Sequence, residues 1–352
     1  IIFMSKFYSI KICAIKKLTD EAVEISFDIP ENLTQVFSYK SGQYITIESV
    51  IKKESIRRAY SICSSMHENK LAIGVKKVKN GKMSTWLNEI VKVGDTVDVM
   101  PPNGNFQINS SSKNQSLGLC AGSGITPILS ILKDTLHNNE DSTFTLIYGN
   151  RSPESEMFVG ELVALKEKYN NRLQIIKFYS DLNIEDHFFG NIDENNLSEI
   201  FANKQELLNS DNFLICGPGN MIDNLNDFLI QKDITKDKII FERFSSSDVD
   251  TEVPNVENLA CDYTFIIDDE EYEITEENNK ESVLDIALKN DLDAPYSCKG
   301  AVCSTCKAKL ISGEVEMSKN FSLSESEIKE GYILACVSHH KTKNVTIDFD
   351  VF

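Results

Sequence analysis

The stretch YSCKGAVCSTCKAKL, residues 296–310, carries three cysteines in the spacing C-x4-C-x2-C. A fourth cysteine follows in the later segment GYILACVSH. Three thiolates from one loop and a fourth from a distant segment are the ligand pattern of a 2Fe-2S cluster. The small residues in the four-residue gap allow the loop to wrap around such a cluster, so that backbone N–H groups point at its sulfides. The spacing therefore predicts a 2Fe-2S cluster bound by Cys298, Cys303, Cys306 and Cys336.

Other uses of these four cysteines fit the spacing less well. A structural zinc site usually joins two C-x2-C pairs, and the second pair is missing here. A redox dithiol would need only Cys303 and Cys306, and it would leave Cys298 and Cys336 without a function. Four buried structural cysteines that bind nothing are the plainest alternative.

Residues 260–352 as a whole resemble plant-type ferredoxin domains, which implies an α+β domain with a β-grasp fold. The run CDYTFIIDDEEYEIT predicts a β-hairpin with an acidic turn, and ESVLDIALKN predicts a helix. The loop departs mildly from this family, because Ala301 stands where a glycine is common. Residues 246–259, which lie in a polar and acidic stretch around Pro254, are the best candidate for a linker to this domain.

Residues 114–245 alternate between short apolar runs and stretches with helical spacing. LGLCA reads as a buried strand bounded by glycine, and ITPILSILKDTL has the spacing of a helix. Further strands and helices follow in TFTLIYG, EMFVGELVALKEKY, LQIIKFYS, NFLICG, NMIDNLNDFLIQ and KIIFERF. This alternation predicts an α/β domain, in which helices cover a parallel sheet.

Two turns of this α/β segment suit a nucleotide. In AGSGITP, Gly122 and Gly124 allow the backbone to approach a pyrophosphate. Thr126 and Pro127 suit the N-cap and the first position of the next helix, whose N-terminus attracts phosphate. A lone G-x-G is a weak signal, and CGP at 216–218 is by itself more simply a buried cysteine before a helix.

Residues 5–113 are predicted to form an antiparallel β-barrel. Short runs of alternating polarity, such as FYSIKICAI, AVEISFDI, QYITIES and LAIGVKKV, are separated by turn residues. Pro101-Pro102 and Asn103-Gly104 are expected to mark the turn after the last strand.

The barrel segment contains a set of short motifs in a fixed order. The motif R-x-Y-S at 58–61 is weak alone, because an ordinary strand can carry a surface arginine. A guanidinium suits a pyrophosphate, and an aromatic ring two residues further on lies on the same face of the strand. SGQY precedes this motif, and GVKKV, GKMSTWL and PPNGNF follow it. With this ordered set, residues 5–245 resemble the ferredoxin–NADP reductase superfamily.

The resemblance implies a flavin site and a nicotinamide site. Arg58 would pair with the FAD pyrophosphate, Tyr60 would stack on the isoalloxazine ring, and Ser61 would act beside flavin N5. The remaining FAD contacts would come from Ala59, Val75, Lys76, Lys82, Met83, Ser84 and Phe244. Cys216 would act beside nicotinamide C4, and the coenzyme would also be held by Gly122, Gly124, Thr126, Gly217, Pro218 and Met221. FAD is favoured over FMN because the G-x-x-S segment at 81–84 suits a pyrophosphate.

The choice of coenzyme depends on the end of the second strand of the parallel sheet. NADH enzymes often carry an acidic residue there for the ribose 2′-hydroxyl, whereas this sequence has Asn150, Arg151 and Ser152. Arg151 could bind a 2′-phosphate through two hydrogen bonds. The next strand lacks the Ser-Arg pair of plant-type reductases, which argues in the other direction. We expect NADPH, with NADH as the alternative.

Composition excludes several classes of function. The net charge of −18 would repel the phosphates of nucleic acid. The sequence lacks the run of ~20 apolar residues that a membrane span needs, and its first residues do not read as a secretory signal, so we expect a cytoplasmic protein. The odd number of cysteines, nine, argues against a disulfide framework. Residues 260–352 hold 19 acidic and 9 basic residues, which indicates either solubility or a docking face for a basic partner.

Some cysteines and histidines receive no functional prediction. Cys13 and Cys261 are expected to be small core residues. His339 and His340 are expected to be exposed in a loop, and the five histidines show no metal-like spacing.

The order of flavin barrel, nucleotide domain and ferredoxin domain suggests a path for electrons from NAD(P)H through FAD and the cluster to a partner protein. Plant-type clusters have potentials near about −400 mV, which suits a donor to oxygenases. The string YSCKGAVCSTCKAKLISGEVEM carries much of a further resemblance, to reductase components of the phenylacetyl-CoA epoxidase type, which covers nearly the whole chain. The implied partner is a di-iron oxygenase. Reductases of ring-hydroxylating oxygenases or of fatty-acyl desaturases are the runner-up, and an iron–sulfur redox sensor or carrier without turnover is the alternative of another class.

Overall fold

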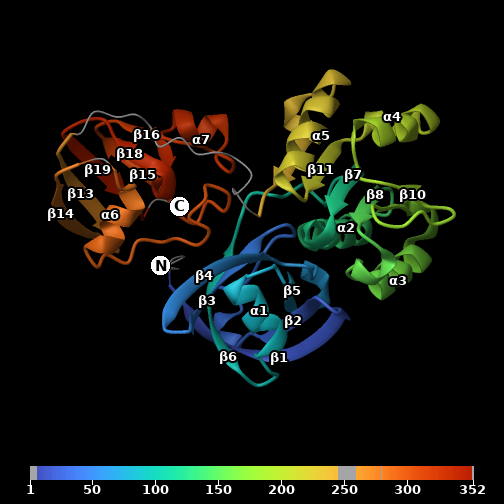
Figure 1. Cartoon of the computed structure of the whole chain (residues 1–352), viewed down its shortest axis with the longest axis horizontal. Helices are drawn as coiled ribbons and strands as arrows, with labels where there is room; N and C mark the ends of the chain where they lie inside the picture. The colour runs from blue at the N-terminus through green and yellow to red at the C-terminus, as the bar shows by residue number, and fades with distance from the viewer. Residues whose placement is uncertain (1–5, 245–258, 279, 351–352) are drawn as a thin grey trace. The chain divides into compact units, whose positions relative to one another are not determined.

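The computed structural model describes residues 6–244, 259–278 and 280–350. The chain divides into two compact units, with the boundary between Arg243 and Phe244. The first unit contains a β-barrel and a parallel-sheet domain, and the second unit is a smaller sheet domain (Figure 1). Apart from Leu259, the predicted linker at 246–259 lies outside the described residues. No helix within the described ranges has the length and apolarity to cross a membrane.

The barrel consists of six antiparallel strands in the order β4-β3-β6-β1-β2-β5. Their bounds are β1 Tyr8–Thr19, β2 Ala22–Asp28, β3 Tyr44–Ile51, β4 Glu54–Ser61, β5 Leu71–Lys76 and β6 Thr96–Asn103. A bridge between Ile62 and Ile73 joins the ends of the two outer strands, which confirms a closed barrel. Helix α1 (Lys82–Glu89) lies over the barrel and buries Met83 and Leu87 in its core (Figure 1).

The prolines at 101 and 102 do not form the predicted turn, because both belong to β6. The register between β6 and β3 shifts between Met100 and Asn103, so the two prolines fall in a bulge. A bulge leaves residues outside the ladder, and the missing proline N–H groups are tolerated there. The turn begins at Asn103-Gly104, where Gly104 has a φ of +124°.

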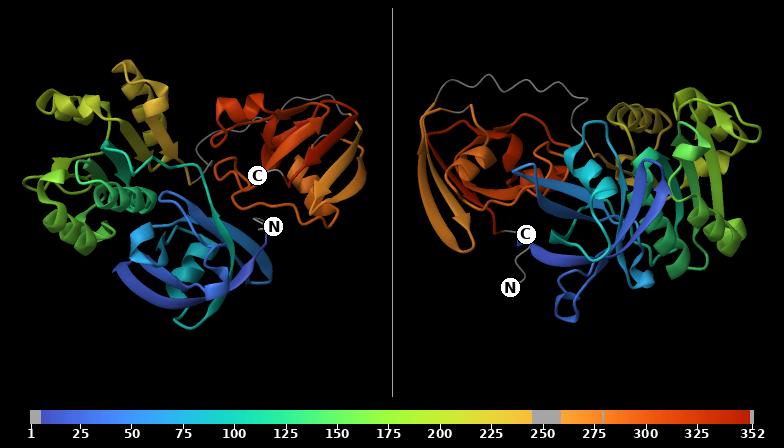
Figure 2. Two further views of the ribbon diagram at one scale, coloured as in Figure 1. Left: turned by 180° about the vertical axis from the view of Figure 1, so that it is seen from behind. Right: turned by 60° about the horizontal axis from the view of Figure 1, so that its bottom comes forward.

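The second half of the first unit is a parallel sheet in the order β10-β9-β8-β7-β11-β12, which confirms the predicted α/β domain. The strands are β7 Gln115–Ala121, β8 Thr143–Asn150, β9 Leu173–Tyr179, β10 Phe188–Phe189, β11 Asn212–Cys216 and β12 Ile239–Glu242. The helices are α2 Ile125–Asn138, α3 Val159–Tyr169, α4 Glu194–Asn203 and α5 Gly219–Gln231. Buried side chains of α2 and α3 share one hydrophobic cluster, and those of α4 and α5 share another, so helices cover both faces of the sheet (Figure 2).

The second unit contains a five-stranded sheet in the order β14-β13-β19-β15-β17 and a small sheet of β16 and β18, in agreement with the predicted α+β domain. Its elements are β13 Cys261–Ile267, β14 Glu270–Glu276, α6 Val283–Lys289, β15 Lys307–Ser312, β16 Val315–Met317, α7 Glu325–Lys329, β17 Tyr332–Leu334, β18 Ser338–His340 and β19 Asn344–Asp348. The predicted hairpin is confirmed, and its acidic turn has positive φ at Asp268 and Asp269, as a two-residue turn between twisted strands requires. Helix α6 buries its apolar residues in the same core as β13.

The predictions for the remaining cysteines and histidines were partly wrong. Cys261 is buried as expected, but Cys13 is exposed, because the register of β1 shifts around it and turns its side chain outward. His339 and His340 are buried in β18 rather than exposed in a loop. The two ring nitrogens of His340 lie 2.7 Å from the Tyr263 hydroxyl and 2.7 Å from the carbonyl oxygen of Leu259, which satisfies this buried side chain.

Candidate functional site

Three strand ends meet where the barrel faces the parallel sheet. Cys216 ends β11, Glu242 ends β12, and the two residues stand opposite each other in the parallel pairing. Ser61 ends β4 of the barrel, and its hydroxyl donates a hydrogen bond of 2.7 Å to Glu242 Oε2. The carboxyl ends of parallel strands meet at one edge of a sheet, which is where α/β domains bind ligands. The structure thus places Ser61 and Cys216 around a shared carboxyl group.

Glu242 is a site residue that the sequence analysis missed. Burial raises the pKa of Glu242 to about 7, although the hydrogen bond from Ser61 acts in the opposite direction. Burial, reinforced by the neighbouring Glu242, also holds the pKa of the Cys216 thiol well above its usual range. The site therefore contains a carboxyl group that can exchange a proton near neutral pH beside a neutral thiol. The signal was present in KIIFERF, where an acidic residue ends the last strand of a parallel sheet.

The residues after Glu242 anchor the end of β12. Arg243 is buried, and its guanidinium forms an ion pair with Asp223 of α5. Phe244, the aromatic residue that was expected at the flavin, follows at the start of the second unit and is 43% exposed.

The turns after β7 and β11 approach each other closely. A Cβ atom on Gly124 would lie 2.0 Å from the carbonyl oxygen of Cys216, so only glycine fits at this position. Gly122 has a φ of +53°, a left-handed conformation that glycine adopts without strain. The Met221 side chain covers Gly217, since a Cβ atom there would lie 2.7 Å from its methyl carbon. The two predicted coenzyme turns thus form one surface at the strand ends.

Helix α2 begins earlier than predicted. Its N-cap is Gly124, because the 3-10 turn of Gly122–Gly124 leads directly into the helix. Thr126 therefore does not cap the helix, and its hydroxyl donates a hydrogen bond of 3.0 Å to the carbonyl of Ser123. Pro218 is the N-cap of α5. Neither helix has a side-chain cap, which leaves the first backbone N–H groups available to an anion.

The R-x-Y-S motif lies at the end of β4, in the barrel wall. Arg58 and Tyr60 share one face of this strand, with Ala59 between them. Arg58 is exposed, and its guanidinium donates a hydrogen bond of 2.7 Å to the carbonyl of Arg57. Burial raises the pKa of Tyr60 above its usual range. Val75 lies inside the barrel core, so only its backbone can face a ligand.

The N-terminus of α1 is a second candidate for an anion. Its N-cap, Gly81, makes no side-chain cap bond. The Ser84 hydroxyl accepts a hydrogen bond of 3.1 Å from the N–H of Val78, and it therefore holds the preceding loop. Lys82 takes part in an exposed ion pair, and Met83 is buried in the barrel. In this arrangement the backbone N–H groups of the first turn, rather than these side chains, are placed for a phosphate.

A cavity of about 590 Å³ lies where the barrel meets the end of β8. Lys76 and Arg151 line this cavity. Lys76 Nζ also lies beside Gly122, at 3.6 Å from where a Cβ atom would stand. Burial, together with the charge of Arg151, lowers the pKa of Lys76. Arg151 is 62% exposed and forms an ion pair of 3.1 Å with Glu21 of the barrel.

The loop that carries three of the cysteines has an unusual backbone. Lys299, Ala301 and Ser304 have φ values of +50°, +63° and +55°. Left-handed residues among right-handed ones turn successive N–H groups toward a common centre, which suits an anionic group. Ala301 thus stands where glycine would be unstrained, and this explains the glycine that is common in such loops. The methyl group of Ala301 is buried in the core of the domain.

The four predicted ligands lie as two pairs of thiols, Cys298 with Cys303 and Cys306 with Cys336. The N–H of Gly300 donates to Cys298 Sγ at 3.3 Å, and the N–H of Cys298 donates to Cys303 Sγ at 3.5 Å. The hydrogen bond from Cys303, supported by backbone N–H groups, lowers the pKa of Cys298 to about 6. The pKa values of Cys303 and Cys306 are raised, because each faces its partner sulfur in a buried position.

Two thiol pairs fit a 2Fe-2S cluster, because each of its two irons takes two thiolates. The backbone N–H groups that point at sulfur supply the hydrogen bonds that such a cluster needs. Within the described ranges, no three side chains of ligand type converge as the ligands of a single metal ion would. None of the nine cysteines is in a disulfide.

Comparisons with known proteins assign a family to each part of the chain. Residues 9–108 match the oxidoreductase FAD-binding domain, and residues 119–227 match the oxidoreductase NAD-binding domain. Residues 265–341 match the 2Fe-2S iron-sulfur cluster binding domain. These matches confirm the three predicted cofactor-binding domains in their predicted order.

Similarity also extends over the whole chain. The chain is 36% identical to a subunit of 1,2-phenylacetyl-CoA epoxidase from Escherichia coli, over 99% of both sequences. It is 30% identical to the ferredoxin reductase component of 3-ketosteroid-9-alpha-monooxygenase from Rhodococcus rhodochrous, over 96% of this chain and 95% of that protein. The structure of phthalate dioxygenase reductase matches 97% of this chain and 98% of its own, with a TM-score of 0.59 and 24% identity, and it shows the same fold.

Proposed function

We propose that this chain is the NAD(P)H-dependent reductase component of an oxygenase, because it belongs to the family of oxidoreductases that join an FAD-binding, an NAD-binding and a 2Fe-2S domain. The observation that carries this proposal is the similarity to the 1,2-phenylacetyl-CoA epoxidase subunit, which spans all three domains. We propose domain boundaries at 5–113, 114–245 and 260–352, with a linker at 246–259. The matched ranges lie inside these boundaries.

The residues at the strand ends would hold the coenzyme and adjust its reaction. When bound, FAD and the cluster allow a donor of two electrons to reduce an acceptor that takes one electron at a time. The glycines at 122 and 124 and the first N–H groups of α2 would bind the coenzyme pyrophosphate. Cys216 and Met221 would flank the nicotinamide, with Gly217 and Pro218 shaping the turn between them.

The barrel would hold the flavin. Arg58 would bind the FAD pyrophosphate together with the N–H groups at the start of α1, and Tyr60 would face the isoalloxazine ring. Ser61 would act beside flavin N5, where its hydroxyl is oriented by Glu242 at 2.7 Å. With a pKa of about 7, Glu242 can hold or release a proton at this hydroxyl near neutral pH.

NADPH is the coenzyme that the cavity at the end of β8 favours. Arg151 lines it, and its guanidinium suits the additional 2′-phosphate of NADPH. The ion pair between Arg151 and Glu21 would have to open when that phosphate binds. NADH is the alternative, and it would leave this ion pair intact.

The partner would be a di-iron oxygenase of the phenylacetyl-CoA epoxidase type. The support is the 36% identity to a component of that enzyme, compared with 30% identity to the reductase component of 3-ketosteroid-9-alpha-monooxygenase. A monooxygenase of the 3-ketosteroid-9-alpha type is therefore the second candidate. We also propose a cytoplasmic location, because nine cysteines without a disulfide suit a reducing compartment.

The test is an anaerobic reduction of the purified protein. NADPH or NADH is added in separate stopped-flow experiments while the visible spectrum is recorded. We expect the flavin absorbance to bleach first and the cluster absorbance afterwards, faster with NADPH. A cluster spectrum that neither coenzyme bleaches would refute a reductase and favour a redox sensor or carrier.

A further inference from the structure

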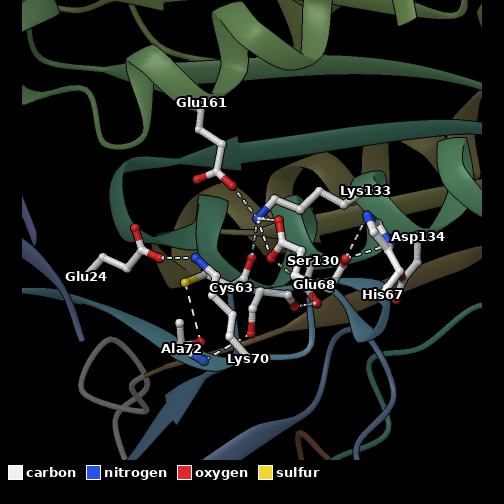
Figure 3. A network of polar contacts seen from close by, with 12 residues as sticks. Glu24, Cys63, His67, Glu68, Lys70, Ala72, Ser130, Lys133, Asp134 and Glu161 are labelled. Carbon is white, nitrogen blue, oxygen red and sulfur yellow. Dashed lines mark hydrogen bonds and ion pairs between the residues drawn. The ribbon is translucent and has the colours of Figure 1, made fainter. Parts of the chain in front are cut away.

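A buried polar seam joins helix α2 to the flavin barrel. On the helix side it consists of Ser130, Lys133 and Asp134, which lie on one face of α2 because they are three and four residues apart. On the barrel side it consists of Ser41 and the segment 63–68, which follows the flavin strand β4. Figure 3 shows Cys63, His67 and Glu68 of this segment beside the helix residues. We call this set of residues the α2 seam. Its three helix residues are at most 2% exposed.

Lys133 lies at the centre of the α2 seam. Its Nζ is 3.1 Å from Glu68 Oε1 and donates to the carbonyl oxygen of Cys63 at 3.1 Å, both in the barrel (Figure 3). It also forms an ion pair with Glu161 of α3, in the nucleotide domain. Burial opposes the charge of Lys133, but Glu161 and Glu68 outweigh this effect and raise its pKa. The ammonium group therefore stays charged and bridges the two domains.

Asp134 and Ser130 hold the same barrel segment by its backbone and side chains. Asp134 accepts a hydrogen bond from the Ser41 hydroxyl, and its Oδ1 lies 3.1 Å from His67 Nδ1. The Ser130 hydroxyl donates a hydrogen bond of 2.5 Å to the carbonyl of Ser64. These contacts attach the segment after β4 to α2 at several points.

The α2 seam is close in the chain to both sides of the site at the strand ends. Cys63 lies two residues after Ser61, and Lys133 lies nine residues, or about 14 Å of helix, after Gly124. Helix α2 therefore connects the coenzyme turn to the seam, and the seam connects to the flavin side of the site. At the strand ends themselves, the hydrogen bond between Ser61 and Glu242 joins the two domains, and the space around it must admit both a flavin and a nicotinamide.

We propose that Lys133 and Asp134 are positioning residues, which set the distance between the flavin side of the site at Ser61 and the coenzyme side at Gly124 and Cys216. Neither residue is one that we place in contact with cofactor or coenzyme. The kinetic part of this inference rests on the proposed function. A misplacement of about 1 Å in such a site lowers a rate by about 100-fold, so a small shift at the seam would be visible in the kinetics.

The test compares two substitutions that leave carboxylates without their lysine: Glu68 and Glu161 in the case of Lys133, and Glu24 in the case of Lys70. Lys133→Met breaks the ion pair with Glu68 between the domains, whereas Lys70→Met breaks the pair with Glu24 at 2.8 Å, which lies within the barrel. With NADPH in stopped flow, we expect Lys133→Met to slow flavin reduction about 10- to 100-fold with nearly unchanged coenzyme affinity. Lys70→Met should change the rate by less than about 2-fold, because it leaves the contacts between the domains in place.

Hydrogen exchange of the full chain supplies a measurement that does not depend on activity. We expect the amides of residues 62–68 to exchange faster in Lys133→Met than in Lys70→Met, with residues 261–276 as the internal reference. If Lys133→Met does not fold, the triple variant with Glu68→Gln and Glu161→Gln removes the unpaired charges and is measured in its place. Normal reduction and normal exchange in these variants would overturn the inference. Failure of the wild type to accept electrons from either coenzyme would refute the proposed function, while the exchange data would still decide whether the seam holds segment 62–68.

Discussion

The cysteine loop and the strand-end site are built in opposite ways. Three of the four predicted cluster ligands fall between residues 298 and 306, and the carbonyl oxygen of Ala301 in this loop accepts hydrogen bonds from Phe321 and Ser322 of the same domain. Ser61 and Glu242, by contrast, share a hydrogen bond across 181 residues of sequence and belong to two domains. A site within one domain depends on the packing of that domain alone, whereas a site between domains depends on how the domains pack.

The two regions also differ in how they shift the pKa values of their acidic groups. In the cysteine loop, hydrogen bonds lower the pKa of Cys298 to about 6, while the pKa values of its partner Cys303 and of Cys306 are raised. At the strand ends, burial raises the pKa values of Glu242 and Cys216, so the site disfavours charge. The first arrangement favours a thiolate at Cys298 alone, and the second favours groups that stay neutral or exchange a proton.

The strongest test of this independence is the substitution Cys336→Ser. It should remove the iron and the visible absorbance of the cluster, because one thiol pair loses a member. NADPH-dependent reduction of ferricyanide should stay within about 2-fold of the wild type, since the flavin is reduced without the cluster. Cys261→Ser is the control, as this buried cysteine is not one of the four predicted ligands. A full iron–sulfur spectrum in Cys336→Ser would show that the ligand set is wrong.

The strand-end site should respond to Glu242→Gln. Glutamine keeps an acceptor for the Ser61 hydroxyl but cannot release a proton. We expect flavin reduction by NADPH to slow by about 100-fold, the lower end of what a general acid–base group contributes. The cluster spectrum should stay unchanged. An unchanged rate of flavin reduction would show that the carboxyl group of Glu242 has no part in the reaction.

The same residue should make the stability of the first unit depend on pH. The folded pKa of Glu242, about 7, is above its ordinary value of 4.5, so the folded state binds more protons between these values. The contribution of Glu242 to stability is then complete below pH 4.5 and is lost as the pH rises through 7, by about 3 kcal/mol. Urea unfolding of the flavin-free protein, followed by the fluorescence of the single tryptophan, Trp86, measures this loss in the barrel unit. In Glu242→Gln the loss should disappear, and a loss that persists would place its origin elsewhere.

The choice of coenzyme gives a smaller effect. Arg151→Ala should raise the KM for NADPH about 10-fold, since a hydrogen bond to a charged group contributes ~1.5 kcal/mol, and it should change the KM for NADH little. Glu21→Gln frees Arg151 from its exposed ion pair and should lower the KM for NADPH by about 2-fold. Steady-state kinetics with both coenzymes measures these changes. Equal effects of Arg151→Ala on both coenzymes would exclude a 2′-phosphate site at this residue.

The smallest effect is expected for Ala301→Gly in the cysteine loop. Relief of the left-handed conformation should stabilise the domain by about 1 kcal/mol, and the loss of a buried methyl group should cost about 0.8 kcal/mol. Thermal unfolding followed through the cluster absorbance should therefore change little. A large loss of stability would mean that the methyl group of Ala301, rather than the backbone, holds the loop.

Much of the fold could be predicted because local signals decide it. The spacing of the cysteines, the alternation of strands and helices, and the acidic turn at Asp268-Asp269 all depend on residues that are close in sequence. The order of the motifs around Arg58 and Gly122 was sufficient to predict a flavin domain followed by a nucleotide domain, and the family matches confirm both. Short-range patterns can be recognised in a sequence because side-chain periodicity and turn chemistry act over a few residues.

Only the tertiary structure decided which distant residues meet. The sequence did not indicate that Glu242 would bind Ser61, that Lys133 would be buried between two domains, or that His340 would lie in the core. Each of these depends on burial and pairing between segments far apart in the chain, and a charged or polar residue carries no local sign of its future partner. The cysteine spacing by itself thus determined the cofactor of the second unit. The packing of α2 and β12 against the barrel decided the geometry of the site in the first unit, because the distances and pKa values at a site between domains depend on how the domains pack.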